Sequence, residues 1–290
     1  MTRRMARRGF IAALAAGLAS ACSPLGTLNG LNNLSPGDRG VRKAAGDVPF
    51  GDDPRQRLDI YAPVKSDTPL PVIVFFYGGS WASGSRGGYG FAAKAFAARG
   101  FTVVVPDYRL VPQVHFPGFV EDGAAAVAWT MANIGRYGGD PAKVSLVGHS
   151  AGAYIAMMLA LDPQWLHAAG SDPARLRAVA GLAGPYDFVP FDVAATRNAF
   201  GKAADPATTQ PISFARGDAP PLFLATGTED TMVLPRNSRK LAKAVEAAGG
   251  KAILREYPEL GHVGIVVTLS KPFRGRAPVL RDVVEFLKAH

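Results

Sequence analysis

Five short apolar runs, none interrupted by a charged residue, constrain the fold of this 290-residue chain more than any other feature. Runs that are apolar on both faces are typical of strands buried in a parallel sheet. Segments long enough for a helix separate them, and parallel neighbours require such crossovers. The pattern predicts an α/β protein in which helices cover both faces of an open, mostly parallel sheet. The predicted strands are residues 72–77, 101–105, 144–148, 178–182 and 222–226.

Apolar residues recur at helical spacing in three of the remaining segments. These segments are residues 124–134, 241–248 and 279–286, and a glycine directly follows the first two. Hydrophobic residues make up 48% of the chain, which excludes an intrinsically disordered protein. The sequence shows neither an internal repeat nor a second hydrophobic core. We therefore expect one folded domain over residues 52–290.

The first 21 residues have the pattern of an export signal. Arg3, Arg4, Arg7 and Arg8 precede an apolar run over residues 10–19, and a run of this length is too short to span a bilayer. The Arg7-Arg8 pair also resembles a twin-arginine signal. We expect residues 1–21 to be a signal peptide and the protein to be exported to the periplasmic side of a bacterial cell envelope.

The only cysteine, Cys22, directly follows this segment. Residues 19–22 (Ala-Ser-Ala-Cys) resemble a bacterial lipobox, in which the cysteine is lipidated, although leucine is more usual at the first position. We predict membrane attachment through a lipidated Cys22. The alternative is an ordinary cleaved signal peptide in which the cysteine is incidental. Residues 22–51 are rich in Gly, Asn, Ser and Pro and are predicted to be a tether to the domain.

The formal net charge of +9 raises the question of a nucleic-acid or membrane partner. Four of these charges belong to the predicted signal peptide, and the chain from Cys22 onward carries a net charge of +5. That part of the chain has no run of basic residues interleaved with aromatic ones. The sequence therefore predicts no nucleic-acid partner.

A serine lies in the pattern that activates it as a nucleophile. Residues 148–152 (Gly-His-Ser-Ala-Gly) stand between a predicted strand and a predicted helix. In this setting Ser150 occupies a turn so tight that its close neighbours lack side chains. The Ala151 amide then points toward the oxygen that becomes negative during acyl transfer. The alternative is a purely structural Gly-Ser-Gly turn.

Two adjacent glycines follow the predicted strand that ends at Tyr77. Gly78 and Gly79 have no Cβ to obstruct their N–H groups. Together with the Ala151 amide they are predicted to form an oxyanion hole. A bare glycine turn is the alternative interpretation.

An acid and a base complete the predicted site. Asp230 follows the predicted strand 222–226, and His262 lies 32 residues farther along the chain. Functional groups in sheets of this kind gather at the carboxyl ends of strands. The order serine, aspartate, histidine is that of α/β-hydrolases. Ser150, Asp230 and His262 are therefore the predicted catalytic residues, with Glu229 as the alternative acid.

A long proline-containing segment, residues 188–220, interrupts the alternation of strands and helices. Segments of this length inside a compact domain are usually lids or binding loops. We predict a small lid, with a flexible surface insertion as the alternative. Trp81 and Phe188 are candidates for binding the substrate, and filling the core is the alternative role for both.

Other polar residues are assigned structural roles. His149 is expected to pack rather than act as the base, and Asp187 to lie beside the lid or the pocket. Residues 107–109 (Asp-Tyr-Arg) are expected to form a buried ion-pair network under the site. No nucleotide-binding or zinc-binding motif is present, so the sequence predicts neither a cofactor nor a metal.

From about Asp59 to Lys288 the chain resembles the α/β-hydrolase carboxylesterases that carry an HGG-type oxyanion loop. Arylformamidases and feruloyl or acetyl-xylan esterases are near relatives of that group. The motifs described above carry the resemblance, together with residues 139–141 (Gly-Asp-Pro) and 184–187 (Gly-Pro-Tyr-Asp). One departure is Tyr77, which stands where these proteins commonly have a histidine that braces the loop.

The resemblance implies a serine hydrolase that cleaves a small-molecule carboxylic ester through an acyl-enzyme intermediate. Cleavage of an N-formyl amide, as in arylformamidases, is an alternative that uses the same machinery. A third possibility is an envelope lipoprotein that keeps the fold as a binding module.

Overall fold

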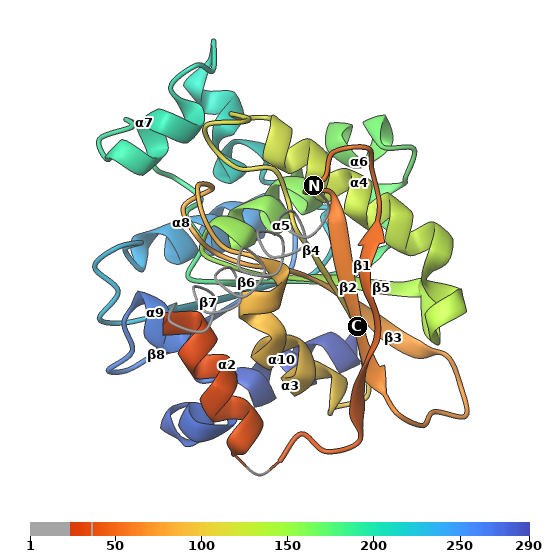
Figure 1. Cartoon of the computed structure of the whole chain (residues 1–290). Helices are drawn as coiled ribbons and strands as arrows, with labels where there is room; N and C mark the ends of the chain where they lie inside the picture. The colour runs from red at the N-terminus through yellow and green to blue at the C-terminus, as the bar shows by residue number, and fades with distance from the viewer. Residues whose placement is uncertain (1–23, 36) are drawn as a thin grey trace, which may run out of the picture.

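The computed structural model describes residues 24–35 and 37–290. Its centre is an eight-stranded sheet with the order β1-β2-β4-β3-β5-β6-β7-β8 (Figure 1). Strands β3 to β8 are parallel, whereas β2 pairs antiparallel with β4 and β1 antiparallel with β2. The strands are β1 (Val41–Pro49), β2 (Arg57–Pro63), β3 (Leu70–Phe76), β4 (Thr102–Pro106), β5 (Gly139–His149), β6 (Leu176–Leu182), β7 (Leu222–Gly227) and β8 (Ala252–Tyr257).

The five strands predicted from continuous apolar runs are confirmed as β3 to β7. Their residues are buried because helices cover both faces of the sheet; in β3, for example, every residue from Val72 to Phe76 is fully buried. The predicted strands did not include β1, β2 or β8. Strands β1 and β8 lie at the edges of the sheet, where partly exposed positions replace a continuous apolar run.

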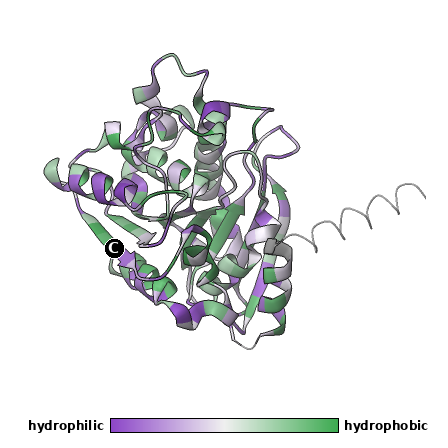
Figure 2. Ribbon diagram, turned by 90° about the vertical axis from the view of Figure 1, so that its left-hand side faces the viewer, coloured by the Kyte–Doolittle hydropathy of each residue, from purple (hydrophilic) through white to green (hydrophobic). Residues whose placement is uncertain are grey.

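Helices cover the two faces of the sheet. The helices α3 (Gly90–Ala97) and α10 (Val279–Ala289) lie together on one face (Figure 1). The opposite face carries α4 (Gly118–Asn133), α5 (Ala151–Leu161) and α8 (Arg236–Ala247). Hydrophobic residues concentrate on the central strands, as Figure 2 shows. The three predicted helices are confirmed as α4, α8 and α10. Within the described residues, no helix combines the length and the apolar character needed to cross a membrane.

Helix α5 contains no charged residue. All eleven of its residues, from Ala151 to Leu161, are buried. A helix that is apolar all round belongs inside the molecule, and α5 packs against α4, α6 (Gln164–Ala168), β3, β5 and β6. The residue before it, Ser150, is therefore attached to the most deeply enclosed helix of the fold.

The prediction of a tether over residues 22–51 is wrong for the described part of that segment. Residues 24–34 form helix α2, and residues 41–49 form strand β1 of the sheet. The side chain of Asn29 donates to the carbonyl oxygens of Gly87 and Gly88 at 3.0 and 2.8 Å and accepts from the Phe91 amide at 2.9 Å. Polar residues that resemble a linker in sequence therefore bond to backbone groups of the domain.

The predicted signal peptide, residues 1–21, and the predicted lipidation site Cys22 lie outside the described residues.

The segment 188–220 is a folded insertion between β6 and β7. It contains the helix α7 (Ala194–Phe200) and two short 3₁₀ turns, η4 (Pro206–Thr209) and η5 (Pro211–Phe214). Hydrogen bonds attach it to the body of the domain: Phe116 donates its amide to Ala199, and the Tyr154 hydroxyl donates to the carbonyl of Thr209, both at 2.9 Å. These bonds argue against a flexible surface insertion.

Because β1 completes the sheet, a chain that begins at Asp52 should be less stable than one that begins at Ser23. We expect the melting temperature to fall by about 5–10 °C, which corresponds to a few kcal/mol in a domain of this size, since the edge of β2 loses its partner. Differential scanning calorimetry of the two chains measures the shift. Equal melting temperatures would contradict the assignment of β1 to the folded domain.

Candidate active site

Three residues from separate loops form a continuous hydrogen-bonded chain. The His262 Nε2 atom lies 2.8 Å from Ser150 Oγ, and its Nδ1 atom lies 2.8 Å from Asp230 Oδ2. A carboxylate only accepts hydrogen bonds, so Nδ1 carries the proton and Nε2 is left to accept the proton of the serine hydroxyl. The structure thus brings the three predicted residues together with the protonation pattern that a serine nucleophile requires.

The loop after β7 holds the acid in place. The other oxygen of Asp230, Oδ1, accepts the amides of Met232 and Val233 at 2.9 and 2.8 Å. The carboxylate is almost fully buried, with 2% of the residue exposed. Glu229, the alternative acid, is exposed to solvent. The geometry therefore favours Asp230 over its neighbour.

Ser150 occupies a turn that only glycines on either side permit. Its backbone has φ 54° and ψ −120°, an unfavourable region for a non-glycine residue. A Cβ on Gly148 would lie 2.3 Å from the carbonyl oxygen of Gly152, and a Cβ on Gly152 would lie 2.1 Å from that of Phe76. The Ser150 amide donates to the Leu182 carbonyl of β6 at 2.8 Å. Two neighbouring strands therefore hold the strained turn.

The predicted oxyanion loop passes directly against this turn. A Cβ on Gly78 would lie 2.9 Å from the Cβ of Ser150, so no side chain fits between the two backbones. Gly79 has φ +145°, and the next two residues, Ser80 and Trp81, also have positive φ, at 53° and 57°. Consecutive non-glycine residues in this region store strain, which is typical of functional loops.

The three predicted oxyanion donors differ in their surroundings. Ala151 begins α5, and amides in the first turn of a helix have no carbonyl partner within the helix. Gly78 packs directly against the Ser150 turn and Gly79 follows it in the same loop, so all three amides remain the predicted donors.

Comparison with known proteins agrees with this geometry. The profile of the family described as BD-FAE matches residues 58–245, which is more than half of the chain. The chain belongs to the BD-FAE family. It is also 31% identical over 272 residues to Esterase LipC of Mycobacterium tuberculosis (strain ATCC 25618 / H37Rv), covering 82% of this chain and 67% of that protein.

The BD-FAE chain is also similar to a plant protein and to a solved structure. It is 30% identical over 264 residues to the probable isoprenylcysteine alpha-carbonyl methylesterase ICMEL1 of Oryza sativa subsp. japonica, covering 82% of this chain and 61% of the plant protein. The chain thus spans less than two thirds of the plant relatives it matches. The structure of an inhibited Esterase B from Lactobacillus rhamnosis aligns with a TM-score of 0.78 at 21% identity over 96% of both chains. The predicted α/β-hydrolase fold is confirmed.

The two candidate substrate-binding residues belong to one aromatic cluster in this BD-FAE chain. Trp81 is 3% exposed, and its ring lies edge-on to those of Phe200 and Tyr154, with centroids 4.7 and 5.4 Å away. Phe188, which is partly buried, packs on Phe200 at 5.1 Å and on Trp81 at 6.2 Å. The cluster joins the oxyanion loop to the 188–220 insertion. Trp81 is mainly a packing residue here, and Phe188 has the more accessible ring.

His149 packs beneath the site, as the sequence predicts. Its Nε2 atom lies 3.3 Å from the backbone carbonyl oxygen of His262. A carbonyl oxygen only accepts hydrogen bonds, so Nε2 of His149 carries the proton. Its Nδ1 atom then accepts the hydroxyl of Tyr89 at 3.2 Å. Complete burial, together with the nearby His262, lowers the pKa of His149 to about 3. This imidazole is therefore neutral and occupied on both sides.

The other structural predictions also match the contacts. Asp107 pairs with Arg86, and Arg109 pairs with Asp122 at 2.7 Å. Asp187 forms an ion pair with Lys240 of α8 at 2.5 Å. Sequence reasoning did not identify Arg55, whose role is described below, because an arginine in a polar loop carries no local signal of its partners.

Because the pKa of His149 is lowered, we expect the free energy of unfolding to decrease at acid pH. The unfolded chain binds a proton at this site below about pH 6.5, whereas the folded chain does so only near pH 3. The contribution of neutral His149 to the free energy of unfolding is complete above pH 6.5 and is lost as the pH falls toward 3. Between pH 7 and pH 5 this group alone should lower the free energy of unfolding by about 2 kcal/mol.

Urea denaturation of the wild-type protein and His149→Gln at both pH values measures this effect. The variant has no group that titrates at this position. Between pH 7 and pH 5 its free energy of unfolding should therefore fall by about 2 kcal/mol less than that of the wild type. Parallel pH dependence in the two proteins would refute the assignment of a neutral, buried His149.

Proposed function

We propose that this protein is a serine hydrolase that cleaves carboxylic esters through an acyl-enzyme intermediate. The observation that carries the proposal is the chain of hydrogen bonds from Asp230 through His262 to Ser150, with 2.8 Å at each link. The named relatives, which include Esterase LipC, support an ester as the substrate. Nothing in the site selects a formamide over an ester.

In the proposed acylation step, Ser150 Oγ attacks the ester carbonyl carbon while His262 Nε2 removes the hydroxyl proton. The carbonyl oxygen becomes an oxyanion and accepts hydrogen bonds from the predicted donors, the amides of Gly78, Gly79 and Ala151. One such donor is typically worth ~3–4 kcal/mol of the barrier. Asp230 holds the imidazole in the required tautomer and stabilises its charged form.

The tetrahedral intermediate then collapses. The bond between the carbonyl carbon and the alcohol oxygen breaks, and the imidazolium of His262 gives its proton to the departing alcohol. A water molecule attacks the resulting acyl-enzyme as His262 takes one of its protons. The same histidine returns that proton to Ser150 Oγ as the carboxylic acid leaves, so the enzyme is restored.

We further propose that the substrate carries an apolar group next to the ester. Large apolar side chains are exposed on both segments that supply the acid and the base, the loop after β7 and the start of helix α9 (His262–Val267). Met232 is 69% exposed, Leu234 41% and Val263 53%. Such side chains in a group are typical of a surface that binds an apolar ligand. The aromatic rings of Phe188 and its neighbours lie beside the oxyanion loop and extend this character.

The roles of the three residues are tested by substitution, with p-nitrophenyl acetate as the substrate. Ser150→Ala should lower kcat by at least about 10³-fold, and Asp230→Asn by about 10³–10⁴-fold, because the histidine loses its orientation. Glu229→Gln is the matched control and should remain within twofold of the wild type. Full activity of Ser150→Ala would refute the proposal, and the reverse result for the two acids would reassign the acid to Glu229.

The localisation that we propose rests on the sequence of the N-terminal segment. The basic residues, the short apolar run and the position of the only cysteine support export and attachment of a lipid to Cys22. The protein would then act on the periplasmic side of a bacterial envelope.

Cys22→Ser tests the lipid anchor directly. The full-length wild-type protein, expressed in a bacterium supplied with radiolabelled palmitate, should carry the label and sediment with membranes. The variant should lose the label because its side chain has no thiol. A wild-type protein that is processed without incorporating label would indicate an ordinary cleaved signal peptide instead.

A further inference from the structure

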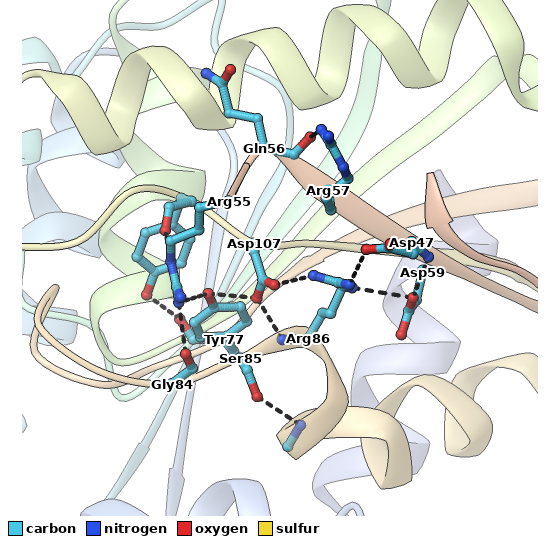
Figure 3. Close-up of polar contacts among 12 residues, drawn as sticks. Asp47, Arg55, Gln56, Arg57, Asp59, Tyr77, Gly84, Ser85, Arg86 and Asp107 are labelled. Carbon is cyan, nitrogen blue, oxygen red and sulfur yellow. Dashed lines mark hydrogen bonds and ion pairs between the residues drawn. The ribbon is translucent and has the colours of Figure 1, made fainter. Parts of the chain in front are cut away.

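The side chain at the start of the oxyanion loop is fully buried and makes two polar contacts. The Tyr77 hydroxyl donates to Asp107 Oδ1 at 2.8 Å and accepts from Arg55 Nη2 at 2.9 Å (Figure 3). Its ring stacks between those of Tyr108 and Tyr89, with centroid distances of 4.7 and 5.7 Å. These contacts therefore fix both the ring and the hydroxyl of Tyr77 in place.

Arg55 connects this tyrosine to the far side of the loop. The Nη2 atom that contacts Tyr77 also donates to the carbonyl of Gly84 at 2.7 Å, and Nε donates to the carbonyl of Tyr108 at 2.7 Å. Gly84 itself lies against the tyrosine ring, because a Cβ there would be 2.7 Å from a ring carbon of Tyr77 and from the carbonyl oxygen of Gly78. The loop thus closes on the tyrosine that begins it.

Asp107 holds the same segment at both ends. Its Oδ1 atom accepts the Tyr77 hydroxyl and also the Arg86 amide at 2.7 Å, and its other oxygen pairs with the Arg86 guanidinium (Figure 3). The Tyr77 carbonyl accepts the Tyr108 hydroxyl at 2.8 Å. One buried carboxylate therefore anchors residues 77 and 86, which bracket the oxyanion loop.

The residues between these anchors are strained. Gly79, Ser80 and Trp81 all have positive φ, and each non-glycine residue in that region costs on the order of 1 kcal/mol or more. Strain persists only where the surroundings maintain it. The Gly79 amide lies two residues from Tyr77, so a loosened anchor would move the donor itself. A displacement of about 1 Å in such a group costs ~10²-fold in rate.

We propose that Tyr77 is a positioning residue for catalysis, which fixes the oxyanion loop through Asp107 and Arg55. The role rests on the proposed esterase function. Burial and the Asp107 carboxylate raise the pKa of Tyr77, so the phenol keeps the proton that it donates to Asp107. Arg55 fills the remaining acceptor site on the oxygen.

Tyr77→Phe removes the hydroxyl and keeps the ring. We expect kcat for p-nitrophenyl acetate to fall about 10–100-fold with KM within twofold, because oxyanion donors act on the transition state. A trifluoromethyl ketone forms a tetrahedral adduct with serine, so its inhibition constant should rise in the same proportion. Tyr108→Phe, which removes the bond to the Tyr77 carbonyl, should lower kcat in the same way but by less.

Tyr257→Phe is the matched control. The Tyr257 hydroxyl donates to Asp282 Oδ2 at 2.9 Å and links β8 to α10, and the residue is 4% exposed. The control removes a tyrosine–carboxylate hydrogen bond that is part-buried and lies away from the site. It should lower the melting temperature and leave kcat within twofold of the wild type.

These measurements distinguish a positioning role of Tyr77 from a purely structural one. A kcat for Tyr77→Phe that equals that of Tyr257→Phe would overturn the positioning role while leaving the esterase function intact. A lower kcat with an unchanged inhibition constant for the ketone would also overturn it, since the oxyanion hole would then be undisturbed. If the wild-type enzyme neither turns over esters nor reacts with the ketone, the proposed function fails, and the role of Tyr77 fails with it.

Discussion

The close packing of the Ser150 turn against the end of β3 is the constraint on which the site depends. Gly152 lies so near the Phe76 carbonyl that a Cβ would approach it to 2.1 Å. This approach places the start of the buried helix α5 beside the chain that continues from β3 into the oxyanion loop. The nucleophile and the predicted oxyanion donors therefore come from two strands that pair directly, β3 and β5, and their separation follows from the strand spacing.

Buried polar contacts fix two loops of the site, the loop after β7 and the oxyanion loop. The loop after β7 keeps Asp230 oriented with two backbone amides. Arg55 and Asp107 surround the start of the oxyanion loop. Buried polar groups are costly unless they are satisfied, and satisfied networks are rigid. The strained backbone from Gly79 to Trp81 thus lies between well-anchored segments, which is how a fold maintains conformations that are unfavourable in isolation.

Features that depend on local patterns were predictable from the sequence. Features that depend on contacts between residues far apart in the sequence were not. The parallel strands β3 to β7 were predictable because burial on both faces demands continuous apolar runs. Ser150 was predictable because its turn requires glycines at fixed positions. Helix α2 and strand β1 were mistaken for a tether, since Asn29 finds its partners almost 60 residues away. Arg55 was missed for the same reason, because Tyr77, Gly84 and Tyr108 are distant in sequence.

Local requirements in the sequence were enough to predict the fold class, the nucleophile Ser150 and the order serine, acid, histidine, because strand periodicity and the glycine turn are properties of short segments. The choice between Asp230 and Glu229 required the folded structure, since it depends on which carboxylate is buried within 2.8 Å of His262. The structure also revealed that Asp107 and Arg55 hold the Tyr77 hydroxyl. Hydrogen-bond partners are set by distance in space, and a sequence without the fold does not specify those distances.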